Sequence, residues 1–158
     1  MQAEKKTMTE FLILLLTAVT SQLTLASPVR FQDCGSSKGS LIEVHVDPCD
    51  SNPCTLYKGR QVTLKLVFNS KEHITDAKAV IHGIILGIPV PFPLEDARVC
   101  PNVEPACPLD PSVGKYTYTV SFPVKHAYPS IRLKVRVAIQ NAEKENVICA
   151  RLPVQISS

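Results

Sequence analysis

Residues 131–140 read Ile-Arg-Leu-Lys-Val-Arg-Val-Ala-Ile-Gln, in which apolar and polar side chains alternate with one alanine as the exception. A period of two places the two kinds of side chain on opposite faces of a β-strand. The segment therefore predicts a strand with one face against a core and an outward stripe of Arg132, Lys134 and Arg136. We interpret this stripe as a solvated face; the alternative is a contact with an acidic partner or with anionic lipid headgroups.

The same alternation recurs along the chain and is separated by turn signals. Further strands are expected in 60–69, 115–124 and 148–156, and a shorter one with Ile42, Val44 and Val46 facing inward. The turn signals are Tyr57-Lys58-Gly59, the proline-rich stretch 100–111, Tyr128-Pro129-Ser130 and residues 141–146. About seven short strands with such spacing predict an all-β, immunoglobulin-like sandwich of two sheets.

One nearly uncharged segment, residues 79–94, breaks this pattern and ends Gly87-Ile88-Pro89-Val90-Pro91-Phe92-Pro93. Prolines at alternate positions remove hydrogen-bond donors on one side, which predicts an edge strand or a polyproline-like path. Ile88, Val90 and Phe92 point to the other side and should line the interior. An edge without continuous hydrogen bonding would let the sheets open, so we expect an apolar cavity between them. The alternative is a rigid strand that lines a core without a void.

The beginning of the chain has the pattern of an export signal. Lys5 and Lys6 precede an apolar run over 11–16, and the small residues Thr24 and Ala26 precede a cleavage point. We expect a signal peptide over 1–26 and one mature domain over 27–158. A membrane anchor is the alternative, but the run is shorter than the ~20 apolar residues that span a bilayer.

Six cysteines follow this signal, and an even number in an exported chain predicts disulfide bonds. The sequence alone allows many pairings. If Cys49 pairs with Cys54 and Cys100 pairs with Cys107, each across a short proline-containing loop, Cys34 and Cys149 remain to join the two ends of the domain. A zinc site is the alternative, but it lacks a Cys-x2-Cys pair and neighbouring histidines.

The remaining composition argues against several classes of function. The net charge is +3 and no Lys/Arg block is present, so nucleic acid is not an expected partner. No nucleophile motif, metal motif or pair of carboxylates occurs in a catalytic context, and bridged cysteines leave no thiolate. We therefore expect no enzyme, no metal and no cofactor. The four histidines are scattered at His45, His73, His82 and His126.

Five motifs together resemble the ML lipid-recognition family across nearly all of the mature chain. They are Asp33-Cys34-Gly35-Ser36; Pro48-Cys49 with Pro53-Cys54; His82-Gly83-Ile84 with the proline-rich run that follows; Pro123-Val124-Lys125 with Tyr128-Pro129-Ser130-Ile131; and Pro153-Val154-Gln155-Ile156.

The resemblance implies a monomeric carrier that binds a cholesterol-like sterol between its sheets and transfers it to membranes or to a membrane sterol transporter. It also implies the bridges Cys34–Cys149, Cys49–Cys54 and Cys100–Cys107, and a secreted location or the lysosomal lumen. The lipid-contacting positions would be Val90, Phe92, Val124 and Tyr128, with Pro123 beside them. Leu86, Ile88 and Pro89 would form the pocket rim, the surface that docks on a membrane sterol transporter during handover. Transient contact with an anionic membrane surface is a separate expectation.

Two features depart from the family's lysosomal members. Val137 and Ala150 stand where those members carry tryptophans, and the chain contains no tryptophan. It also has no Asn-x-Ser/Thr sequon, and Lys65 occupies the position of a familiar glycan. The alternatives are therefore an extracellular carrier of fatty acids or semiochemicals, a lipid-sensing module of innate immunity, or an adhesion module with a filled core.

Overall fold

The computed structural model describes residues 26–158, so the predicted signal peptide lies outside the described residues except for Ala26. This part of the chain is built almost entirely from strands, with one short 3-10 helix. The elements are β1 (Gln32–Asp33), β2 (Gly39–Asp47), β3 (Cys54–Tyr57), β4 (Gln61–Ser70), β5 (Ala77–Ile85), β6 (Ile88–Phe92), η1 (Cys100–Asn102), β7 (Val103–Glu104), β8 (Tyr116–Pro123), β9 (Arg132–Asn141) and β10 (Asn146–Ser157).

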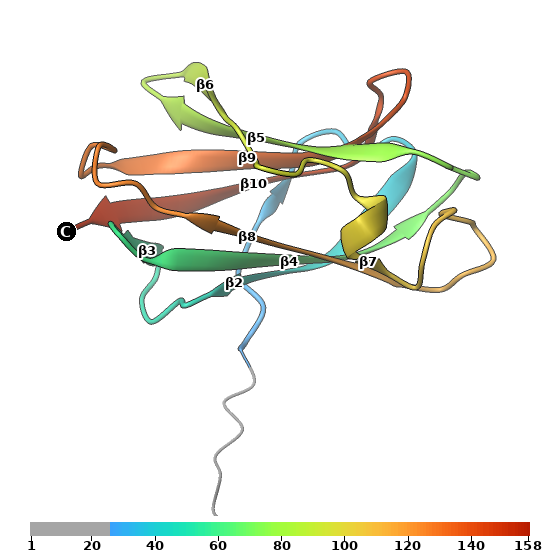
Figure 1. The fold of residues 1–158 in the computed structure, drawn as a ribbon, viewed down its shortest axis with the longest axis horizontal. Helices are drawn as coiled ribbons and strands as arrows, with labels where there is room; N and C mark the ends of the chain where they lie inside the picture. Colours follow the sequence, from blue (N-terminus) through green and yellow to red (C-terminus); the bar gives the residue numbers. More distant parts are fainter. Residues whose placement is uncertain (1–25) are drawn as a thin grey trace, which may run out of the picture.

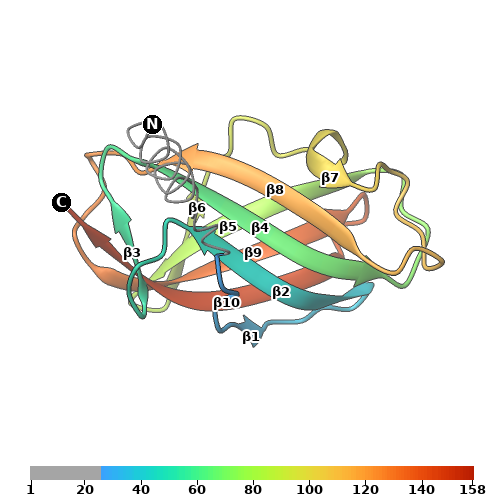
Figure 2. The same ribbon diagram turned by 90° about the horizontal axis from the view of Figure 1, so that it is seen from below.

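The strands form two sheets that face each other (Figure 1). The first has the order β1-β10-β9-β5-β6, with β3 added parallel to β10; the second has the order β2-β4-β8-β7. Figure 2 looks onto the second sheet with the first behind it. The predicted all-β, two-sheet sandwich is thereby confirmed. Within the described residues, the structure contains no helix of the length and hydropathy that a membrane span requires.

The predicted alternation is clearest in the burial of β4, whereas β2 departs from it at Ile42. On β4, the inward residues Val62, Leu64, Leu66 and Phe68 are all buried. The expectation that Ile42 faces inward is wrong, because 36% of this residue is exposed. The pairing of β2 with β4 shifts register between Leu41 and Glu43, and such a bulge inverts the facing of the residues before it.

The proline-rich segment forms the edge strand β6, as predicted, but its pairing is more regular than expected. All five residues of β6 pair in antiparallel register with β5. Pro89 and Pro91 occupy alternate positions, so their missing donors fall on the side away from β5, where no strand lies. Phe92 packs against the core, whereas Ile88 is 65% exposed and does not line the interior.

The space between the sheets is filled at one end, which we call the closed end. There the rings of Phe68 and Tyr116 stack with centroids 5.8 Å apart. The Tyr116 hydroxyl accepts a hydrogen bond from the backbone N–H of Asp110, at 2.8 Å, which holds the preceding loop against the core. Val99 and Leu109 are fully buried beneath that loop. This half of the sandwich is therefore an ordinary close-packed core.

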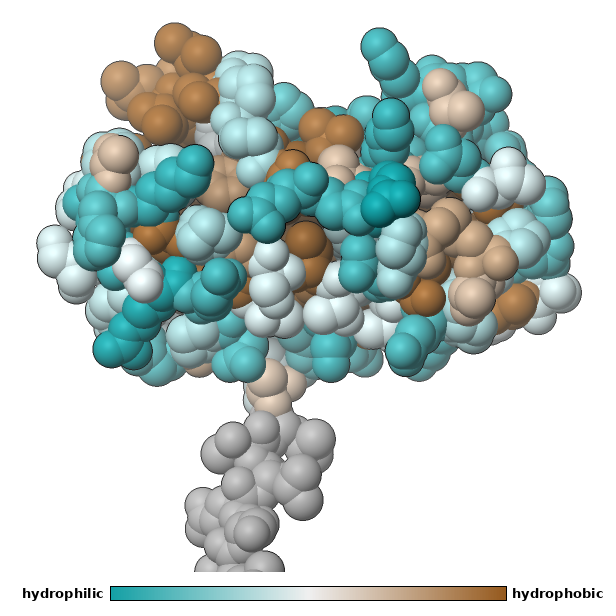
Figure 3. All heavy atoms as spheres, in the orientation of Figure 1, coloured by the Kyte–Doolittle hydropathy of each residue, from teal (hydrophilic) through white to brown (hydrophobic). Residues whose placement is uncertain are grey.

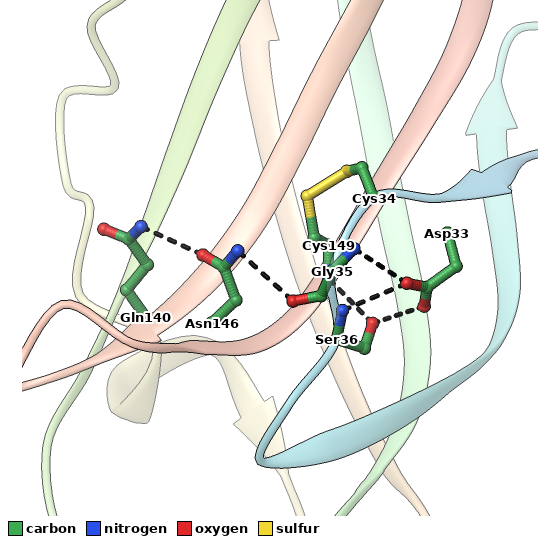
Figure 4. The surroundings of a disulfide bond; sticks show 7 residues. All are labelled: Asp33, Cys34, Gly35, Ser36, Gln140, Asn146 and Cys149. Carbon is green, nitrogen blue, oxygen red and sulfur yellow. Dashed lines mark hydrogen bonds between the residues drawn. A yellow bond between two sulfur atoms is a disulfide. The ribbon is translucent and has the colours of Figure 1, made fainter.

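The Cys34–Cys149 bridge joins β10 at this end to the segment that precedes β2. Figure 4 shows how polar contacts surround it. The Asp33 carboxylate accepts hydrogen bonds from the backbone N–H groups of Gly35 and Ser36, and the Ser36 hydroxyl accepts one from the N–H of Cys149. Hydrogen bonds from the Ser36 side chain and backbone are the main cause that lowers the Asp33 pKa, so this carboxylate stays ionised.

All three expected bridges are present: Cys34–Cys149, Cys49–Cys54 and Cys100–Cys107. They differ greatly in the loop that each closes. The first spans a sequence separation of 115 residues, and the second spans only 5.

Replacing Cys34 and Cys149 together by alanine is expected to destabilise the fold far more than replacing the pair Cys49 and Cys54. Loop entropy predicts a loss of about 4.7 kcal/mol for a loop of order 100 residues and about 2 kcal/mol for the short loop. Calorimetry should show Tm falling by roughly 10 °C or more for the first variant. Equal shifts for the two variants would contradict this account.

Candidate functional site

A cavity of about 300 Å³ lies between the sheets at the end opposite the closed end, which we call the open end. Its walls come from both sheets and are almost entirely apolar. The lining residues are Leu56, Ile81, Gly83, Ile85, Val90, Pro91, Phe92, Pro93, Phe122, Val124, Lys125, Tyr128, Pro129, Ile131, Leu133, Val135, Val154 and Ile156. Phe92 reaches across the gap here, but the other inward side chains leave part of the space between the sheets unfilled.

Three aromatic rings form one wall of this cavity. Phe92, from β6, contacts Phe122, from β8, with ring centroids 5.0 Å apart, and Tyr128 with centroids 5.7 Å apart. Neither pair is parallel, because the ring planes meet at 63° and 58°. Edge-on aromatic pairs of this kind favour one another by about 0.5–1.5 kcal/mol beyond the area they bury. The group therefore joins the edge strand of one sheet to the facing sheet.

The structure brings together four of the five residues that were predicted to contact lipid. Val90, Phe92, Val124 and Tyr128 all line the cavity. Pro123 is exposed and does not line it, because it lies on the outward face of β8. Phe122 takes its place, and the alternation within 115–124 already assigned Phe122 to the inward face.

The predicted rim is a projecting hairpin between β5 and β6. Leu86 is 97% exposed, and Val90, at the mouth of the cavity, is 44% exposed. Leu86 and Gly87 both have positive φ, which turns the chain tightly between the strands. Figure 3 shows the apolar tip as a brown projection at the upper left, where Figure 1 places this hairpin. Exposed apolar side chains grouped in this way indicate an interaction site.

The cavity offers little that could do chemistry. Among the described residues that line it, Lys125 and Tyr128 carry the titratable groups, and both lie in the segment after β8 at the mouth. The backbone N–H of Tyr128 donates to the carbonyl of Lys125 at 3.1 Å, which closes a turn. Within residues 26–158 no group of three or more His, Cys, Asp or Glu side chains is placed to hold a metal ion. The arrangement suits the burial of an apolar molecule.

Two features lie beyond the inner limit of the cavity. Val137 and Ala150, where the resemblance pointed to tryptophans, face each other on β9 and β10 and are fully buried in the core.

The second feature is Tyr118 on β8. Burial, followed by the charge of Asp96, raises the pKa of Tyr118 to about 12, so this phenol stays neutral. Its hydroxyl has no hydrogen-bond partner within the described structure.

Comparison with known proteins agrees with this geometry. Residues 28–156 match the profile of the ML domain. The chain belongs to the ML domain family. The pig protein named NPC intracellular cholesterol transporter 2 is 40% identical over 148 residues, which cover 94% of this chain and 95% of the relative. Because ML-domain relatives of this kind are carriers, membership of the family confirms the prediction that the chain is not an enzyme.

Two solved structures show the same architecture. The crystal structure of a Niemann-Pick type C2 protein from the Japanese carpenter ant superposes with a TM-score of 0.75 at 28% identity, covering 82% of this chain and 100% of that one. Chicken MD-1, solved in complex with lipid IVa, superposes with a TM-score of 0.50 at 13% identity, covering 79% of this chain and 86% of that one. The second likeness shows the shared fold alone.

The two ends of the sandwich should respond differently to loss of an aromatic ring. Phe68→Ala leaves a hole in a close-packed region and is expected to cost about 3–5 kcal/mol. Phe92→Ala should cost clearly less, because its ring is partly exposed and already borders an empty space. Urea denaturation of the two variants measures the difference. A loss for Phe92→Ala equal to that for Phe68→Ala would mean that the cavity end is packed as tightly as the core.

Proposed function

We propose that this protein is a secreted carrier that holds a sterol-like lipid in the cavity between its sheets and delivers it to a membrane or a membrane transporter. The observation that carries the proposal is a preformed apolar cavity that ends beside an exposed apolar hairpin. The pig relative's name, which describes a cholesterol transporter, supports a sterol as the cargo. Val90, Phe92, Val124 and Tyr128 would contact the lipid, and Pro123 would act from outside the cavity by holding the end of β8.

The driving force is the removal of lipid surface from water. Burial contributes about 25 cal/mol per Å², offset by the cost of immobilising the ligand. The cavity volume of about 300 Å³ is at the lower end of the range for ligand pockets, so a rigid ring system requires some widening. Strand β6 is the element that yields, because it pairs with β5 alone and its outer edge carries no donor at Pro89 or Pro91.

A fatty acid is the second candidate, and the size of the cavity favours it. A flexible acyl chain adapts to a narrow space with less movement of the walls than a fused ring system needs. Lys125 at the mouth would then meet the carboxylate, whereas the hydroxyl of a sterol would lie near Tyr128.

The disulfides and the predicted signal support the proposed location. Three bridges indicate an oxidising compartment, which favours the extracellular space or the lysosomal lumen. A signal peptide over 1–26 would direct the chain there and leave 27–158 as the mature domain, which contains the whole of the matched region 28–156. We expect a monomer, because the carrier has to present its hairpin to a membrane or to a transporter.

Two substitutions test the cavity with the fluorescent sterol dehydroergosterol. Gly83→Leu should abolish binding, because Gly83 lines the cavity and its new side chain would occupy the space that the sterol needs. The added Cβ lies 3.0 Å from Leu133 Cδ1, the end of a flexible side chain, so the fold can accommodate it. Phe92→Ala should raise Kd by about tenfold, or about 1.4 kcal/mol.

Ile42→Ala is the control, because Ile42 is an exposed apolar residue on the other sheet. Unchanged affinity in the Gly83→Leu variant would show that the cavity is not the binding site. Competition between unlabelled cholesterol and oleate, together with native mass spectrometry of the secreted protein, decides between a sterol and a fatty acid.

Separate measurements of sterol transfer to vesicles and of sterol binding in solution test the role of the hairpin. Replacing Leu86 and Ile88 by aspartate should slow the delivery of dehydroergosterol to vesicles by about tenfold or more, because charged tips do not enter a lipid surface. Binding of the sterol in solution should not change, since neither side chain lines the cavity. Ile42→Asp provides the matched control. Transfer at the unmodified rate would refute the role of the hairpin.

A further inference from the structure

A second hollow, of about 990 Å³, lies on the outer face of the sheet whose inner face bounds the lipid cavity. The same strands can line both hollows, because successive residues of a strand point to opposite faces of the sheet. On β5, for example, Ile81 and Gly83 line the cavity, whereas His82 and Ile84 line this outer groove. The groove residues are Pro53, His82, Ile84, Gly87, Pro89, Arg132, Leu133, Lys134, Arg136, Arg151, Pro153 and Val154.

The groove is strongly and uniformly basic. It contains four Lys or Arg residues, which we call the groove cations, and among the described residues that line it none is acidic; the groove cations are Arg132, Lys134, Arg136 and Arg151. Their combined formal charge of +4 exceeds the +3 of the whole chain. Acidic residues elsewhere in the chain offset part of this charge, but none of them lines the groove. The groove cations therefore produce a local positive potential.

The strand register places two groove cations and one histidine side by side. Arg136 on β9 lies directly opposite Arg151 on β10 and directly opposite His82 on β5. Directly opposed residues in antiparallel strands have Cβ atoms about 4.5–5.5 Å apart, and like charges at this distance destabilise a sheet. None of the ion pairs found in residues 26–158 involves a groove cation.

Two buried nitrogen atoms in the same row have no hydrogen-bond partner in the described structure. They are Nδ1 of His82 and Nε of Arg151, and these two residues flank Arg136. Buried polar atoms are nearly always hydrogen-bonded, so two unpaired atoms in one row call for an explanation. A merely solvated stripe would leave its nitrogen atoms in contact with water. These two atoms are instead covered and unpaired, whereas the other guanidinium nitrogens of Arg136 and Arg151 are not among the buried unpaired atoms and make no ion pair in the described structure, so a ligand can reach the row through them.

A second row of paired residues, in which only Lys134 is charged, lies beside the row of His82, Arg136 and Arg151. Ile84 lies opposite Pro89 on one side and Lys134 on the other, and Lys134 in turn lies opposite Pro153. The groove therefore combines guanidinium groups, which match the geometry of tetrahedral oxyanions, with a short hydrophobic border. A ligand that fits both rows has an anionic group attached to an apolar part.

We propose that this groove is a binding site for a phosphate monoester, whose phosphate group lies between Arg136 and Arg151 and whose organic part lies along Ile84 and Pro153. The phosphate relieves the repulsion between the two guanidinium groups and offers acceptors to their accessible N–H groups. The site lies on the far side of the sheet from the cavity, so its ligand is distinct from the lipid cargo. The ester is either a soluble molecule or a headgroup in a bilayer, and both present the same chemical group.

The test uses the full mature protein and two probes. Phenyl phosphate represents a soluble monoester, and vesicles of phosphatidylcholine with or without phosphatidic acid represent a headgroup. The wild type should bind at least one probe, with an affinity that falls as salt is added. Replacing Arg136 and Arg151 together by glutamine should weaken that binding by about tenfold or more. The control replaces Lys71 and Lys115, two exposed lysines outside the groove, by glutamine and should bind as the wild type does.

The variants also separate this site from the cavity. Both double variants should bind dehydroergosterol normally, so failure of the lipid proposal and failure of this one give different results. The groove variant should be no less stable than the wild type, because it removes a like-charge pair; should it nevertheless fail to fold, Lys134→Gln tests the same groove. Binding of phenyl phosphate assigns the site to a soluble ester, and binding of phosphatidic acid vesicles alone assigns it to a headgroup. Absence of binding to both probes, or equal binding by the groove variant, overturns the proposal.

Discussion

The two sheets pack closely at one end and leave a cavity between them at the other, and the rest of the molecule depends on this asymmetry. At the closed end, buried side chains from both sheets fill the space, among them Phe68 on β4 and Ile139 on β9, and the Cys34–Cys149 bridge ties β10 to the segment that precedes β2. At the open end, the sheets meet mainly through Phe92, which reaches from the edge strand to the facing sheet. A sandwich held in this way can admit a guest at one end while its core stays intact, because opening there breaks few contacts.

Strands β5, β8, β9 and β10 contribute to both the filled end and the cavity end. Whether a residue packs in the core or lines the cavity therefore depends on its position along the strand. On β8, Tyr116 belongs to the core and Phe122 to the cavity; on β10, Ile148 belongs to the core and Ile156 to the cavity. Membership of the ML domain family places this division in a fold whose relatives include a named cholesterol transporter. The absence of a side chain at Gly83 helps to keep the cavity at the open end unfilled, since a larger residue there would occupy part of it.

Much of the fold could be predicted from the sequence, because strand alternation is a local property, whereas the full set of disulfide pairs came from the family resemblance. The strands around 60–69, 115–124 and 131–140 follow directly from their period of two. Ile42 was misplaced because a bulge depends on the pairing of two strands and leaves no mark within one of them. Pro123 was assigned to the cavity by resemblance alone, although alternation favoured its neighbour.

The outer groove could not be predicted for a related reason. The sequence shows Arg132, Lys134 and Arg136 as a stripe on one strand, but it does not show that Arg151 lies opposite Arg136.

The shared strands have a mechanical consequence. In β5, Gly83 faces the cavity and its neighbours His82 and Ile84 face the outer groove, all on one length of backbone. A guest that pushes β5 outward therefore also moves the wall of the groove, because a peptide chain has no slack between consecutive residues. If filling of the cavity displaced β5, the change would therefore appear on the exterior of this sheet as well.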